Sequence, residues 1–161
     1  SRMETGNMPI SMQNIDIGAF LGNYVKGKRE VINSLQEEII ADTKGITAKV
    51  SMDSEQFQRI LDNLVENSRK HGETTPLKMK IILEKTPKGL SVCFRDNGVG
   101  VPEEKLPHIF EEFYRGDESR NKKEGNGLGL YIVKYLMEAM GGSVRAENAD
   151  GLAVYLELRE V

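Results

Sequence analysis

The sequence predicts an α/β fold, a two-layer sandwich in which three helices pack against one mixed β-sheet. Two observations lead to this prediction. In three segments the apolar residues recur every three or four positions, which is typical of helices with one buried face. Between these segments lie short stretches in which apolar and polar residues alternate, which is typical of strands. Layering the helices on a single sheet would bury the apolar side of every segment.

The first helix is expected over residues 15–36, and two short strands are expected at 38–42 and 46–52 on either side of a Thr-Lys-Gly turn. Asp53 with Gln56 three residues later is a signature of a helix N-terminus. The long helix that follows is predicted to bury one stripe and to end at Gly72. This stripe comprises Phe57, Ile60, Leu61, Leu64, Val65 and Ser68.

Alternating residues at 78–83 and 90–94 predict a hairpin that turns at Pro87-Lys88-Gly89. Residues 96–129 then lack any periodicity, and so long an irregular stretch inside a compact domain is usually functional. The last helix is predicted from about residue 127 to Met140, where Gly141 ends it. A final hairpin is expected from 143–147 and 152–158.

Composition restricts the class of protein. The chain has 161 residues, of which 39 % are apolar and 29 % charged, so it suits one compact domain with a core. Its net charge of −3 argues against a surface for nucleic acid. A lone cysteine, Cys93, cannot form an internal disulfide, and two distant histidines disfavour a zinc site. No apolar run is long enough to span a bilayer, so we expect a cytoplasmic domain without membrane contact.

The second predicted helix carries Asn63, Asn67 and Lys70 at i, i+4 and i+7, so these side chains share one face beside the apolar stripe. Carboxamide oxygens are neutral hard ligands that suit Mg²⁺, and an ammonium group suits phosphate oxygens. Taken alone, the pattern fits a solvated polar face better.

The segment Asp96-Asn97-Gly98-Val99-Gly100 directly follows a predicted strand. An ionised carboxylate only accepts hydrogen bonds, so Asp96 suits an amino group such as the exocyclic amine of adenine. Gly98 and Gly100 would let the backbone approach a flat ligand. An ordinary turn at the end of a strand is the alternative explanation.

The segment Gly125-Asn126-Gly127-Leu128-Gly129 runs into the last predicted helix, where backbone amides and the helix N-terminus can bind phosphate. Its spacing is neither that of a dinucleotide-binding Rossmann motif nor that of a P-loop. A glycine-rich hinge is the alternative. Before it, Phe110, Phe113 and Tyr114 have the spacing of one helical turn, which would hold Arg115 within reach of a terminal phosphate. Aromatic packing beside a surface arginine would explain that segment as well.

In this order, the four motifs resemble the N, G1, F and G2 boxes of sensor histidine kinases, which belong to the GHKL ATPase superfamily. The resemblance covers residues 15–158 and implies the α/β sandwich predicted above (the Bergerat fold), with ATP and Mg²⁺ bound between the helices and the sheet. It also implies that Asn67 is the main Mg²⁺ ligand with support from Asn63, that Lys70 and Arg115 contact phosphate, and that Asp96 reads the adenine amine.

Residues from about 101 to 126 would be the ATP lid. The residues that the resemblance places at the nucleotide are Asn63, Asn67, Lys70, His71, Asp96, Gly98, Gly100, Arg115, Gly125, Gly127, Leu128 and Gly129. Three positions depart from the family pattern. His71 stands where many members have tyrosine, Asn126 replaces a frequent threonine, and Ser68 replaces a common alanine. We expect the change at Ser68 to be neutral.

Family members phosphorylate a histidine in a His-Glu/Asp-Leu-Arg-Thr-Pro-like box, which this sequence lacks. His71 lies in the N box and His108 in the expected lid, so neither is a suitable acceptor. The resemblance therefore implies that the acceptor histidine lies on a separate dimerisation domain of a parent kinase that signals to a response regulator. Residues 1–10 are expected to be a remnant of that domain, and residues 11–161 a monomeric catalytic domain.

Other activities share this fold. Hydrolytic GHKL ATPases use a glutamate base where this chain has Asn63, and an asparagine cannot take up a proton at neutral pH. A serine kinase of the anti-sigma type is disfavoured by the expected remnant at the N-terminus. A nucleotide-sensing module without catalysis stays open, although Asn67, Lys70, Asp96 and Arg115 favour a kinase.

Overall fold

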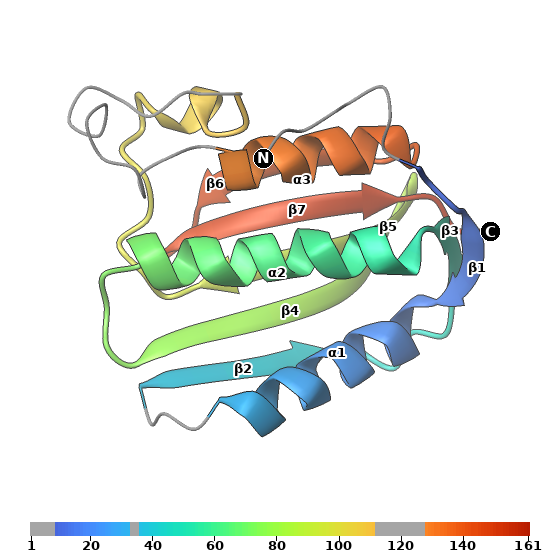
Figure 1. The fold of residues 1–161 in the computed structure, drawn as a ribbon, viewed down its shortest axis with the longest axis horizontal. Helices are drawn as coiled ribbons and strands as arrows, with labels where there is room; N and C mark the ends of the chain where they lie inside the picture. The colour runs from blue at the N-terminus through green and yellow to red at the C-terminus, as the bar shows by residue number, and fades with distance from the viewer. Residues whose placement is uncertain (1–8, 33–35, 112–127) are drawn as a thin grey trace.

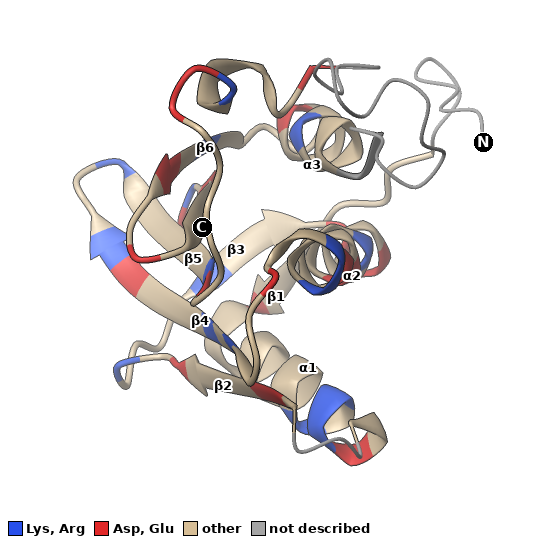
Figure 2. Ribbon diagram, turned by 90° about the vertical axis from the view of Figure 1, so that its left-hand side faces the viewer, with Lys and Arg blue, Asp and Glu red and all other residues tan. Residues whose placement is uncertain are grey.

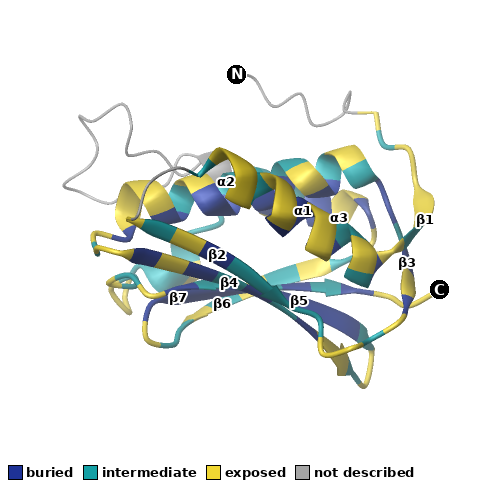
Figure 3. Ribbon diagram, turned by 90° about the horizontal axis from the view of Figure 1, so that it is seen from below, coloured by how far each residue is buried: buried dark blue, intermediate teal, exposed yellow. Residues whose placement is uncertain are grey.

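The computed structural model describes residues 9–32, 36–111 and 128–161. Within these ranges, three α-helices pack on one face of a five-stranded sheet, and the two layers are seen edge-on in Figure 3. The predicted α/β sandwich is therefore confirmed. The helices are α1 (Ile17–Val31), α2 (Ser54–His71) and α3 (Leu128–Ala139). The strands are β1 (Gln13–Asp16), β2 (Glu37–Asp42), β3 (Lys49–Met52), β4 (Leu77–Thr86), β5 (Gly89–Asp96), β6 (Ser143–Asn148) and β7 (Leu152–Leu158).

The five-stranded sheet is mixed. Its strand order is β2-β4-β5-β7-β6, in which β2 and β4 run parallel and every other neighbouring pair is antiparallel (Figure 1). A parallel pair needs a long crossover, and here β3 and α2 provide it between β2 and β4. The two predicted hairpins, β4–β5 and β6–β7, are both present.

The core lies between the sheet and the helices. On β4 the alternate residues Met79, Ile81 and Leu83 are buried, as the sequence pattern predicts. The predicted stripe of α2 is buried in full. Figure 2 shows the helices on one side of the sheet and acidic and basic residues interspersed along the strands. In the part of the chain that the structure describes, no helix has the length and apolar character needed to cross a membrane.

The N-terminal part differs from the prediction. Residues 13–16, of which the last two were expected to begin the first helix, form β1, which pairs with β3 in a separate two-stranded sheet. The helix begins at Ile17, two residues later than predicted, because Asp16 caps it: Asp16 Oδ1 accepts a hydrogen bond from Ala19 N at 3.1 Å. It ends at Val31, since Ile32 is already extended. The strand expected at 46–52 is the shorter β3 and does not join the main sheet.

Asp53 caps α2 as predicted. Its Oδ1 accepts hydrogen bonds from Glu55 N and Gln56 N at 3.0 and 3.2 Å. The Asp53 N–H does not bond to Gln56 but to Met140 Sδ at 3.3 Å, and Asp53 Oδ2 accepts from Ser11 N at 2.7 Å. One capping residue thus joins the start of α2 to the residue after α3 and to the N-terminal segment.

The predicted irregular stretch after β5 is confirmed as far as the structure describes it. Residues 97–111 contain turns and one short 3₁₀ helix, η2 (Leu106–His108). The remainder of the expected lid, from residue 112 onward, lies outside the described residues, as do residues 1–8 of the expected remnant.

Candidate functional site

The site is built around Asp96, the last residue of β5. Asp96 is only 7 % exposed, and its carboxylate accepts three hydrogen bonds. Gly98 N and Leu152 N donate to Oδ1 at 2.9 and 3.1 Å, and Ser68 Oγ donates to Oδ2 at 2.6 Å. A buried carboxylate is tolerated only when donors replace its water, and here two backbone amides and one hydroxyl do so. The side chain is therefore held in one orientation.

The prediction that serine at position 68 is a neutral change is wrong. Ser68 is 3 % exposed on the buried stripe of α2, and its hydroxyl is one of the three donors that hold Asp96. A hydrogen bond to a charged group is about twice as strong as a neutral one. The sequence pattern could not show this contact, because it joins residues 28 positions apart on different elements.

The glycines near Asp96 are required by close backbone contacts. A Cβ at Gly98 would lie 2.7 Å from Gly72 Cα, and Val99 N donates to Gly72 O at 3.0 Å. Gly100 has a φ of +75°, which favours glycine. The segment after β5 therefore packs directly against the C-terminal end of α2.

Several predicted residues line one small cavity at this point. The cavity has a volume of about 20 Å³, which holds about one water molecule. It is lined by Asn67, His71, Gly72, Asp96, Gly100, Val101 and Leu152. The structure thus brings together four residues that the sequence analysis selected from separate motifs: Asn67, His71, Asp96 and Gly100. Gly98 lies beside them against Gly72.

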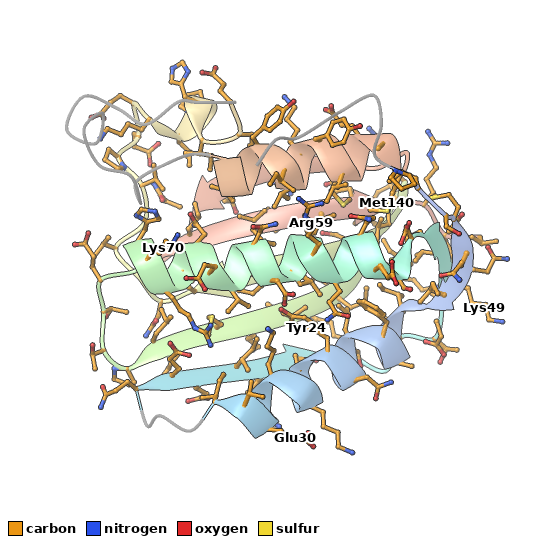
Figure 4. The ribbon with its side chains drawn as sticks, in the orientation of Figure 1. Tyr24, Glu30, Lys49, Arg59, Lys70 and Met140 are labelled. Atoms are coloured by element: carbon orange, nitrogen blue, oxygen red, sulfur yellow. The ribbon has the colours of Figure 1, made fainter. Side chains whose placement is uncertain are left out.

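The polar face of α2 continues on both sides of Asn67. Asn63 lies one turn earlier, where its Nδ2 donates to Arg59 O at 3.0 Å, and Lys70 lies at the C-terminal end of the helix (Figure 4). Among the residues that the structure describes, the side chains of Asn67 and Lys70 make no hydrogen bond or ion pair. Both are therefore available to a ligand, but of Asn63, Asn67 and Lys70 only Asn67 lines the cavity.

His71 contributes to the lining of this cavity. Burial of the ring, and secondarily the charge of Lys70, lower the pKa of His71 from its usual value of 6.5. The neutral ring is therefore favoured at neutral pH, and a neutral imidazole can pack against an uncharged flat ligand.

The other predicted site residues cannot be placed in the same way. Arg115, Gly125 and Gly127 lie outside the described residues. Leu128 and Gly129 form the first turn of α3, so the glycine motif does lead into a helix N-terminus, as the sequence predicts.

Two contributors were missed by sequence reasoning, because both come from the last hairpin. Leu152 donates its amide to Asp96, and Asn148 makes hydrogen bonds to Val101 and Glu103. The only sequence signal was the predicted turn at 148–151, which says nothing about its neighbours in space.

A larger groove, of about 380 Å³, lies between α1 and α2 on the other side of α2. It is lined by Phe20, Asn23, Tyr24, Gly27, Lys28, Val31 and Gln58. Two of its polar side chains are already paired: Tyr24 Oη donates to Asp62 at 2.7 Å, and Lys28 forms an ion pair with the same carboxylate at 3.0 Å. Despite its smaller volume, we therefore regard the Asp96 cavity as the functional site.

Comparison with known proteins agrees with this assignment of the fold. A family model described as histidine kinase-, DNA gyrase B-, and HSP90-like ATPase matches residues 52–161. The chain belongs to this family. The matched range begins at the end of β3 and contains α2, the Asp96 segment, α3 and the last hairpin. The domain is accordingly of the nucleotide-binding ATPase type.

Its relatives are sensor histidine kinases. The chain is 35 % identical to the sensor histidine kinase YkoH of Bacillus subtilis, over 93 % of this chain and 34 % of that protein. It thus spans about a third of the length of this relative. The catalytic domain of histidine kinase ThkA has the same fold, with a TM-score of 0.76 at 24 % identity over 95 % of this chain and 97 % of that one. Full-length ShkA in complex with AMPPNP also has a TM-score of 0.76 at 24 % identity, over 96 % of this chain and 32 % of that one.

Proposed function

We propose that this domain binds ATP with Mg²⁺ at the Asp96 site and transfers the γ-phosphoryl group to a histidine of a separate dimerisation domain. The observation that carries the proposal is the Asp96 carboxylate, which three donors hold at a cavity lined by α2 and by glycine backbone. Family membership and the histidine kinase relatives support the same reading.

Asp96 would select adenine through its charge. A carboxylate accepts and does not donate, so it favours the 6-amino group of adenine over the 6-oxo group of guanine. The cavity of about 20 Å³ is smaller than an adenine ring requires, so the side chains that line it would have to move as the base enters. Gly98 and Gly100 would leave room for the ring along the backbone.

The phosphates and the metal would lie along the polar face of α2. The uncommitted carboxamide of Asn67 fits Mg²⁺, which prefers oxygen ligands and retains several waters, and Asn63 would support it. Bound Mg²⁺ would neutralise charge on the phosphates. Lys70 would contact phosphate, and we extend this role to Arg115 and to the backbone of Gly125, Gly127, Leu128 and Gly129 on the basis of the motifs alone.

The chain's own residues supply positioning and charge neutralisation, which account for most of the catalysis in phosphoryl transfer. The nucleophilic imidazole would come from the dimerisation domain of a parent kinase, and this kinase would then signal to a response regulator. We further propose that residues 11–161 form a monomeric, cytoplasmic catalytic domain and that residues 1–10 belong to the preceding one. Steady hydrolysis is disfavoured, because Asn63 cannot act as a base and its amide is bonded to Arg59 O.

Calorimetric titration with ATP tests the site. Asp96→Asn keeps the shape of the side chain and can retain its contacts to the backbone amides, but it replaces an acceptor with a donor. We expect affinity to fall by about 10- to 150-fold, since a hydrogen bond to a charged group contributes about 1.5–3 kcal/mol. Asp62→Asn is the matched control, because Asp62 faces Tyr24 and Lys28 away from the cavity. Unchanged affinity in Asp96→Asn would show that the base does not bind there.

A second titration tests the metal. Asn67→Ala should weaken ATP binding in the presence of Mg²⁺ but leave binding in EDTA unchanged, because the carboxamide acts through the cation. Equal losses in both conditions would instead assign Asn67 to the nucleotide itself.

The transfer is tested with γ-labelled ATP. The chain alone should acquire no acid-labile phosphohistidine, whereas a separately produced dimerisation domain carrying its histidine should become labelled when the chain is added. Label on the chain itself would contradict the proposed division of labour. Binding of ATP without labelling of any acceptor would favour a nucleotide-sensing module.

A further inference from the structure

The turn that connects β6 to β7 lies beside the segment that follows β5 (Figure 1). Asn148, the last residue of β6, bonds across to this segment with its side chain. Its Oδ1 accepts from Val101 N at 2.9 Å, and its Nδ2 donates to Val101 O at 2.7 Å and to Glu103 Oε2 at 2.9 Å. A carboxamide that bonds to both backbone polar groups of one residue holds it as a neighbouring strand would.

Gly100 shows how closely Asn148 approaches the backbone. A Cβ at Gly100 would lie 2.7 Å from Asn148 Oδ1, and the φ of +75° already favours glycine. Asn148 therefore lies directly behind the backbone of Gly100 and Val101, and both of these residues line the Asp96 cavity. Asn148 itself is not among the residues that line it.

The same turn also holds Asp96. Leu152 N donates to Asp96 Oδ1 at 3.1 Å, and a Cβ at Gly151 would collide with Asp96 O. The Arg95 guanidinium donates to Ala149 O. Residues 148–152 are thus bonded both to the Asp96 carboxylate and to Val101, which also lines the cavity.

We propose that Asn148 is a positioning residue for the nucleotide. By holding Val101 it sets the separation between the Gly100–Val101 backbone and Asp96, and thereby the width of the opening that a base must enter. This inference rests on the proposed function, since it assumes that the base binds at Asp96. It adds a role for the last hairpin, which lies outside every motif used to select the site residues.

The test compares the affinity of the whole chain for ATP with Mg²⁺ and for adenosine. Asn148→Ala should weaken both by about tenfold, which is about 1.4 kcal/mol, because both bonds to Val101 are lost. The comparison with adenosine is informative because Asn148 would affect the binding of the base. The loss of affinity should therefore be equal for ATP and for adenosine, which lacks the phosphates. Asn148→Ser, which can replace one of the two bonds, should fall between the native chain and Asn148→Ala, and it serves if the alanine variant does not fold.

Two control variants separate positioning from stability. Glu103→Ala removes one contact of Asn148 but keeps both bonds to Val101, so affinity should stay within about twofold of the native chain. Tyr24→Phe removes a hydrogen bond of 2.7 Å on the other side of α2, so it should lower the unfolding midpoint without weakening nucleotide binding.

The outcomes distinguish the two proposals. If the native chain binds ATP and Asn148→Ala binds it equally well, or if Tyr24→Phe weakens binding as much, the role of Asn148 is refuted and the proposed function stands. If the native chain binds neither ATP nor adenosine, the proposed function fails first.

Discussion

The hydrogen bond between Ser68 and Asp96 should make a measurable contribution to stability. Ser68 Oγ lies 2.6 Å from Asp96 Oδ2, and both residues are buried. Ser68→Ala removes this donor and leaves the carboxylate with the amides of Gly98 and Leu152 alone. A hydrogen bond to a charged group contributes about 1.5–3 kcal/mol, so the free energy of unfolding should fall by that amount. For a domain of this size the melting temperature should fall by roughly 3–12 °C.

Urea unfolding of the native chain and two serine variants measures the effect. Ser91→Ala is the matched control, because Ser91 is also buried but its hydroxyl has no hydrogen-bond partner among the described residues. Its stability should be nearly unchanged, since the variant breaks no hydrogen bond between described residues. ATP affinity in Ser68→Ala should fall by less than about tenfold, because two amides still orient Asp96.

A double-mutant cycle then isolates the pair. Adding Ser68→Ala to an Asp96→Asn background should cost less than adding it to the native chain, with a coupling energy of about 0.5–3 kcal/mol. If Ser68→Ala destabilises no more than Ser91→Ala, the hydrogen bond contributes nothing to stability, and Ser68 does not help to hold Asp96.

Three further predictions concern single residues. Gly22→Ala should stabilise the domain by about 0.5–1 kcal/mol in urea unfolding, because a Cβ at Gly22 would meet nothing within 4 Å and alanine lowers the conformational entropy of the unfolded chain. A destabilised variant would contradict this prediction. Tyr24→Phe should cost about 1 kcal/mol in the same assay, because it loses the bond to Asp62, and no loss would mean that the bond is negligible. Burial lowers the pKa of His71 in the folded state, so its contribution to stability is complete above pH 6.5 and is lost as the pH falls below that value. Between pH 8 and pH 5.5, His71→Gln should therefore lose less stability than the native chain, and equal losses would refute the assignment.

Much of the fold could be predicted from the sequence because it depends on local periodicity. The buried stripe of α2 and the alternation of β4 each follow from the spacing of apolar residues along one element. The boundaries of α1 could not be predicted in this way. Residues 13–16 pair with β3, more than thirty positions away, and the apolar spacing near Ile15 fits either a helix or a strand.

The candidate site also has a part that could be predicted from the sequence and a part that could not. The sequence by itself determined which chemical groups are available: the amide and ammonium groups on one face of α2, the carboxylate at the end of β5, and the glycines around it. Side-chain spacing on a helix and the lack of a Cβ are local properties, so they can be read without a structure. The resemblance to a known family then supplied their expected roles.

Only the tertiary structure decided what holds these groups in place. Asp96 depends on Ser68 from α2 and on Leu152 from β7, and Val101 in the lining of the same cavity depends on Asn148. These partners are separated in sequence by 28, 56 and 47 residues. The physical reason is that a buried carboxylate must accept hydrogen bonds from donors that packing brings next to it. Which donors these are depends on how the sheet and helices assemble, and no single segment of the sequence determines it.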